Sequence, residues 1–105
     1  MKVIRISKGN EVKEIDISGN LESLQSEVGG YIEFIDLGSG ISMVVNEEGK
    51  LKRLPVNVIA TKIFSSSFGA YDVIAGDVLL VGVDKDGKTI EVPQGAYNFI
   101  PQREI

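Results

Sequence analysis

The chain contains 105 residues, the size of one small domain, and it has no cysteine and no histidine. A disulfide, a thiolate or imidazole zinc site, an iron–sulfur cluster and a Ser-His or Cys-His nucleophile pair are therefore excluded. A net charge of −4 disfavours a nucleic acid partner, because binding to phosphates requires an excess of basic side chains. With 43% apolar residues and 12 glycines against 3 prolines, the composition predicts a turn-rich globular domain.

The apolar segments are too short to cross a membrane. The longest uninterrupted apolar run is Val78–Val81, whereas a bilayer span needs about 20 apolar residues. Residues 1–8 alternate charged and apolar side chains, which is not the pattern of a signal peptide. We therefore expect a cytoplasmic protein with no membrane contact.

The first part of the chain predicts a β-hairpin followed by a helix. Two β-like runs, Lys2–Ser7 and Val12–Ile17, are separated by a polar turn segment. Apolar residues then recur at spacings of three and four after residues suited to an N-cap, and Gly29–Gly30 supplies a stop. The pattern predicts a short amphipathic helix over Leu21–Val28.

Residues 31–54 predict an antiparallel three-stranded meander. Tyr31–Leu37 is apolar on both faces, which predicts an interior strand, and Ile41–Asn46 follows after a turn of glycine and serine. Gly49 occupies the connection position that commonly adopts the left-handed conformation, and Lys50–Leu54 then returns as the third strand.

The next segment predicts a second helix and a loop. Pro55 ends the meander, and Asn57 can cap a short helix that includes Val58 and extends to about Phe64. The small residues of Ser65–Ala70 predict a mobile loop.

The last part of the chain predicts a central strand and a hairpin. The apolar stretch Tyr71–Val83 contains the most hydrophobic segment of the chain, Val78–Val81, and Lys88–Val92 alternates as a partner strand after a turn. The tail from Pro93 has few apolar anchors, so we expect a sheet edge or a partly ordered segment.

Together these elements predict a single α+β domain over residues 1–105, mainly an antiparallel sheet with a three-stranded meander and two short helices. The expected core residues are Ile4, Ile6, Leu24, Val28, Phe34, Met43, Val45, Leu79 and Val81.

Two short motifs resemble parts of ligand sites but fail on context. Asp84-Lys85-Asp86-Gly87 matches part of a calcium loop, yet it lacks the later ligands and lies between two predicted strands. Gly38-Ser39-Gly40 lacks the lysine and the following helix of a phosphate-binding loop. We therefore expect no metal, no cofactor and no catalytic residue.

The remaining polar residues of interest lie in predicted loops and at a helix start. We interpret Glu47 and Glu48 either as solvated charges or as a patch that faces a partner. We interpret Lys50 as one of several charges on an edge strand. Asn57 is either a cap or a ligand contact, and Asp72 either accepts backbone hydrogen bonds or binds a ligand. The candidate interaction or ligand residues are Asn46, Glu47, Glu48, Lys50, Asn57, Tyr71 and Asp72.

Several short motifs occur in an order that resembles a bacterial domain-of-unknown-function family, number 3846. The motifs are Tyr31-Ile32-Glu33-Phe34-Ile35, Asn46-Glu47-Glu48-Gly49-Lys50, Leu54-Pro55-Val56-Asn57 and Tyr71-Asp72-Val73-Ile74-Ala75-Gly76. The similarity extends from the first strand to about Val83, and it departs from the family at Val56 and Val58-Ile59, where members often carry leucine and basic residues. The resemblance implies a small protein or module of Gram-positive gut bacteria, phages or conjugative elements, and it implies no activity, cofactor or catalytic residue.

Three hypotheses about function follow. The first is a non-enzymatic interaction module, from a bacterial or mobile-element protein set, that binds another protein. The alternative is a small-molecule or nucleotide binder that uses Asn57 and Tyr71-Asp72, with the predicted loop at Ser65–Gly69 as a lid. The third is a hydrolase that uses carboxylates alone, which requires two facing carboxyl groups in a cleft. The oligomeric state is left open.

Overall fold

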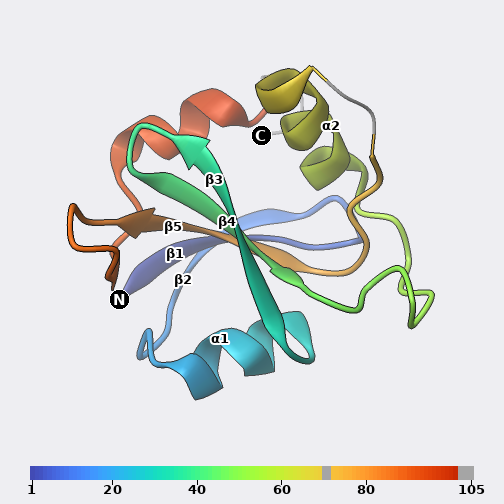
Figure 1. Cartoon of the computed structure of the whole chain (residues 1–105), viewed down its shortest axis with the longest axis horizontal. Helices are drawn as coiled ribbons and strands as arrows, with labels where there is room; N and C mark the ends of the chain where they lie inside the picture. Colours follow the sequence, from blue (N-terminus) through green and yellow to red (C-terminus); the bar gives the residue numbers. More distant parts are fainter. Residues whose placement is uncertain (70–71, 102–105) are drawn as a thin grey trace.

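Figure 1 shows a computed structural model of the chain, in which residues 1–69 and 72–101 are described. The elements in chain order are β1 (Lys2–Ile6), β2 (Val12–Asp16), α1 (Leu21–Val28), β3 (Ile32–Gly38), β4 (Ile41–Asn46), α2 (Val58–Phe68), β5 (Val78–Val83), β6 (Thr89–Ile90) and the 3-10 helix η1 (Gln94–Phe99). The α+β class is confirmed, as are the first hairpin and the helix over residues 21–28.

The strands form one antiparallel sheet in the order β2-β1-β5-β4-β3, and β6 pairs with the end of β5. The predicted central strand is confirmed, because β5 lies between β1 and β4. Its Leu80 pairs with Ile4 of β1 on one side and with Met43 of β4 on the other. The edges of the sheet are β2 and β3.

Helices cover both faces of the sheet, which explains why its middle strands are apolar throughout. In Figure 1, α1 lies below the sheet, and α2 and η1 lie above it. Along β5, Leu79 and Val81 face α1, while Val78 and Leu80 face α2 and η1. All four side chains are 0% exposed, so the strand contributes to two hydrophobic clusters at once.

The prediction of a third meander strand over residues 50–54 is wrong. Residues 47–53 form consecutive turns, in which the N–H of Lys52 donates to the carbonyl of Glu48 and the N–H of Leu54 donates to that of Gly49. β5 already occupies the free side of β4, so no ladder position remains for a following strand. The residue of this connection with a left-handed backbone conformation is Arg53, at φ 55°, and not Gly49 as predicted.

The predicted loop at Ser65–Ala70 is also wrong over its described part. The serines continue α2 to Phe68, and Gly69 ends the helix at φ 63° with its N–H bonded to the carbonyl of Ser65. Small polar residues have only a weak preference against helix, so the buried anchors of α2 decide the outcome. Ala70 lies outside the described residues.

Two further expectations need correction. Phe34 is 43% exposed because it lies on the edge strand β3, on the α1 face but beyond the reach of that helix, whereas the other expected core residues are all buried.

The tail is not an edge of the sheet. Residues 94–99 form η1, and its Ala96 together with the following Ile100 closes the hydrophobic cluster beneath α2.

Candidate functional site

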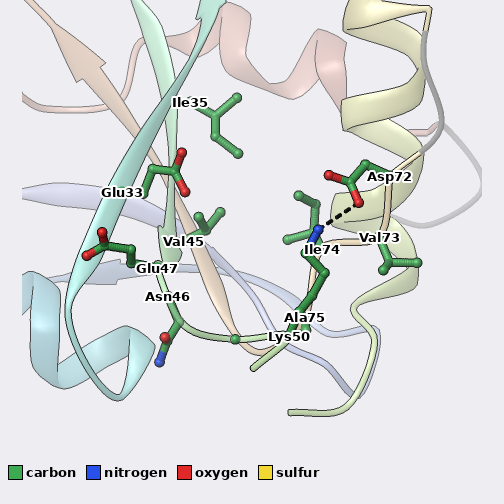
Figure 2. Close-up of a pocket in the computed structure, with 11 residues that line it drawn as sticks. Glu33, Ile35, Val45, Asn46, Glu47, Lys50, Asp72, Val73, Ile74 and Ala75 are labelled. Carbon is green, nitrogen blue, oxygen red and sulfur yellow. Dashed lines mark hydrogen bonds and ion pairs between the residues drawn. The ribbon is translucent and has the colours of Figure 1, made fainter. Parts of the chain in front are cut away.

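Four of the predicted residues gather around one small cleft, with a volume of ≈ 130 Å³ (Figure 2). We call it the acidic cleft. It lies between the end of the β3–β4 hairpin and the segment that precedes β5. Its lining residues are Glu33, Ile35, Val45, Asn46, Glu47, Gly49, Lys50, Asp72, Val73, Ile74 and Ala75.

One wall of the acidic cleft carries two carboxylates. Glu33 pairs with Val45 across the β3–β4 ladder, and the N–H of Glu47 donates to the carbonyl of Tyr31 at 2.8 Å, which extends the ladder by one step. Glu33 and Glu47 are therefore diagonal neighbours on one face of the sheet. Among the residues that the structure describes, neither carboxylate has an ion-pair or hydrogen-bond partner.

The opposite wall carries an ion pair, which Figure 2 shows across the cleft from Glu33 and Glu47. The ammonium of Lys50 donates to Oδ1 of Asp72 at 2.8 Å. This hydrogen bond and the charge of Lys50 lower the pKa of Asp72 below its usual value. Both side chains are at least half exposed, so the pair links the turn to the 72–75 segment with little net stabilisation.

Two residues of the turn serve as its framework. The side-chain amide of Asn46 donates to the carbonyl of Val28 at the end of α1, and its oxygen accepts from the N–H of Glu48. Asn46 is only 5% exposed, so its side chain is committed to these contacts. Gly49 is required for another reason: a Cβ there would lie 2.8 Å from the carbonyl oxygen of Ala75.

Glu48 and Asn57 do not line the acidic cleft. Glu48 pairs with Lys52 at 3.4 Å on the outer side of the turn. Asn57 is 0% exposed, and its side chain donates to two backbone carbonyls and accepts from the N–H of Ala60 as the cap of α2. Its backbone N–H also bonds to the carbonyl of Ile74, so Asn57 holds one wall of the cleft from behind. Tyr71 lies outside the described residues.

Sequence reasoning missed the contribution of β3. Glu33 was available as a signal, because it is a charged residue with apolar neighbours on both sides in a strand predicted to be interior. The fold makes β3 an edge strand, and Glu33 then faces the same cleft as Glu47. The floor that Ile35, Val45 and Ile74 provide depends on long-range packing, which no local pattern indicates.

The comparisons with known proteins assign the family. A family model described as Domain of unknown function (DUF3846) matches residues 1–102. The chain belongs to this family. The match extends past residue 83, so the DUF3846 domain includes β6 and η1 as well as the strands that carry the recognisable motifs. No curated protein and no solved structure matched the chain.

The chemistry available to the DUF3846 chain at this site is that of cation binding. Within residues 1–69 and 72–101, no group of three or more acidic side chains is placed to hold a metal ion. None of the helices in these ranges is long and apolar enough to cross a membrane. The cleft instead combines two unpaired carboxylates with an apolar floor, and this combination suits an organic cation with an apolar stem.

Proposed function

We propose that this DUF3846 domain is a non-enzymatic protein-binding module of the bacterial cytoplasm, belonging to a bacterial or mobile-element protein set. A basic side chain of the partner enters the acidic cleft and meets the carboxylates of Glu33 and Glu47. The observation that carries the proposal is that these two carboxylates lie on one face, beside an apolar floor, with no partner among the described residues.

The dimensions of the acidic cleft favour a side chain over a substrate. Small-molecule sites usually enclose about 300 to 1,000 Å³, whereas this cleft measures ≈ 130 Å³. Lysine and arginine bury an apolar stem and keep the charged head in a polar setting. Ile35 and Val45 suit the stem, and the two glutamates suit the head.

The surface beside the cleft has features of an interface. Leu51 follows Lys50 directly and is 80% exposed, and Val56, which bridges to the cleft residue Ala75, is 48% exposed. Exposed apolar side chains with a charged rim are common where a partner docks. These two residues therefore supply apolar contact area next to the electrostatic anchor.

A quantitative pull-down from the native host tests the proposal. The wild-type chain, the Glu33→Gln/Glu47→Gln variant and a control, Glu11→Gln/Glu22→Gln, serve as baits. The control removes the same number of exposed charges at two positions that do not line the cleft. We expect the control to retain the partner and the cleft variant to lose about three- to tenfold in recovery, the range for two exposed charge contacts.

A second arm identifies the chemistry of the contact. Each protein whose recovery falls with the cleft variant is produced alone, and its surface lysines and arginines are replaced one at a time. One such replacement should reproduce the loss seen with Glu33→Gln/Glu47→Gln. Equal recovery of every protein by all three baits would refute the proposal.

A further inference from the structure

A second hollow lies at the tips of two hairpins, on the opposite face of the sheet from the acidic cleft. We call it the hairpin-tip groove. Its volume is ≈ 450 Å³, within the range of small-molecule sites. The turn after β3 and the loop between β5 and β6, both at the left of Figure 1, border it. Its lining residues are Phe34, Asp36, Gly38, Ser39, Gly40, Ser42, Val83, Asp84 and Gly87.

Ser42 forms the recessed part of the groove and has an unused hydroxyl. The residue is 5% exposed, and among the described residues its Oγ has no hydrogen-bond partner. Every fully enclosed side-chain nitrogen or oxygen in the described ranges does have a partner, so the Oγ of Ser42 must open into the groove. A recessed hydroxyl without a partner is a site where a ligand gains a hydrogen bond.

Phe34 supplies an aromatic surface at the rim. It lies two residues from Asp36 along β3, on the same face of the sheet as Ser42, which pairs with Asp36 across the ladder. The ring is 43% exposed although the chain has a hydrophobic core on the same face. An exposed ring beside a hollow is suited to stacking on a flat ligand or to contact with a cation.

The charge of the groove is negative. One oxygen of Asp36 accepts from the N–H of Gly38, and one oxygen of Asp84 accepts from the N–H groups of Asp86 and Lys88. The second oxygen of each carboxylate has no partner among the described residues. None of the nine described lining residues is basic. A ligand there meets negative charge from two hairpins at once.

We propose that the hairpin-tip groove binds a small planar organic cation, such as an aromatic amidine or a guanidinium compound. The plane of the ligand stacks on Phe34, an N–H group donates to Ser42, and the positive charge lies between Asp36 and Asp84. The glycines of the two turns present backbone without side chains, which leaves room for a flat ligand. This site is independent of the acidic cleft, with which it shares no lining residue.

The test uses three compounds of nearly equal shape: benzamidine (cation), benzamide (neutral) and benzoate (anion). Each is titrated into the full chain, and the amide signals of the groove residues are followed by NMR. We expect benzamidine to bind with a Kd of roughly 1 mM, a realistic affinity for a compound of this size. Benzamide should bind about tenfold more weakly, and benzoate should not bind, because two carboxylates face the ligand.

Three variants sharpen the result. Asp36→Asn/Asp84→Asn keeps the oxygen that each turn requires and removes the charge, so the preference for benzamidine over benzamide should vanish. Phe34→Leu should weaken benzamidine binding about two- to fivefold, the size of an exposed cation–ring contact. Glu33→Gln/Glu47→Gln should leave benzamidine binding unchanged, which separates this proposal from the protein-binding role of the acidic cleft.

Three results would overturn the proposal. They are an absence of groove shifts at roughly 10 mM benzamidine, well above the expected Kd; equal binding of benzamidine and benzamide to the wild-type chain; and shifts that map to the acidic cleft.

Discussion

The acidic cleft and the hairpin-tip groove use the same two strands, β3 and β4, but they differ in how their polar groups are employed. Around the cleft, the side chains of Asn46 and Asn57 form hydrogen bonds within the fold, whereas the carboxylates of Glu33 and Glu47 have no partner among the described residues. In the groove, turns rich in glycine surround the hydroxyl of Ser42, which has no partner in the part of the chain that the structure describes. Unused hydrogen-bonding capacity therefore distinguishes residues available for recognition from residues that build the scaffold.

The largest expected contrast is between two apolar residues in one row of the sheet. Phe34 pairs with Val44, and Val44 pairs with Leu79. Leu79 is 0% exposed, so Leu79→Ala should cost about 2 to 5 kcal/mol of unfolding free energy. Phe34→Ala should cost about 1 kcal/mol, because the half-exposed ring leaves a smaller cavity. Denaturant unfolding measures both, and equal costs would assign Phe34 to the core instead of the groove.

The next contrast separates a framework asparagine from an exposed one. Asn57→Ala removes the cap of α2 and leaves the carbonyls of Ile6 and Gly76 without their side-chain donor. We expect a loss of about 2 to 4 kcal/mol in unfolding free energy. Asn98→Ala, at an exposed position of η1, should stay within about 0.5 kcal/mol of wild type. A loss below about 1 kcal/mol for Asn57→Ala would contradict the structural role of this side chain and favour a role in recognition.

Two glycines compare the turns themselves. Gly49→Ala places a Cβ 2.8 Å from the carbonyl oxygen of Ala75, so the turn must move, and we expect a cost of about 1 to 3 kcal/mol. In Gly87→Ala the new Cβ would lie in open space. Because φ is 83° there, the side chain should still lower the unfolding free energy by about 1 kcal/mol. Thermal unfolding and amide spectra distinguish them. Gly49→Ala should shift the signals of the 72–75 segment, and a spectrum unchanged there would contradict the close contact.

The smallest expected effect is the pH response of the Lys50–Asp72 pair. Lys50 lowers the pKa of Asp72 in the folded chain, so the pair contributes at neutral pH and is lost as pH falls below 3.8 through the lowered value. Replacing Lys50 with methionine should return the pKa of Asp72 toward 3.8, measured from its carboxyl carbon by NMR. An unchanged pKa in Lys50→Met would mean that the ion pair is absent in solution.

The sequence predicted elements where local pattern and tertiary packing agree. Helix α1 has apolar residues at helical spacing, a cap at Asn20 and a stop at Gly29, and its predicted bounds were right. The segment 50–54 was predicted as a returning strand because it follows a turn segment that ends in Gly49, but β5 already fills the free edge of β4. That competition depends on pairing between distant segments, which a local pattern does not report.

The candidate site was predicted in part for a similar reason. Glu47 and Lys50 were selected as residues of an exposed turn and a predicted edge strand, and Asp72 was selected as a carboxylate that could bind a ligand. The three do meet at one cleft. Asn57 was selected for its place beside a proline, and its burial could be recognised only once β1 and residue 76 were seen to converge on it. The groove was missed because Phe34 was assigned to the core and Ser42 carried no motif.

The most direct test of the account is a titration of the full chain with two cations of different shape, followed by NMR. N-acetyl-lysine N-methylamide represents a basic side chain on a peptide, and benzamidine represents a flat cation. We expect the lysine compound to shift the signals of Val45 and Gly49, and benzamidine to shift those of Ser42 and Val83. Glu33→Gln/Glu47→Gln should abolish only the first response. Binding of both compounds at the same hollow, or a lysine response that survives the double variant, would contradict the assignment of the acidic cleft to a basic side chain.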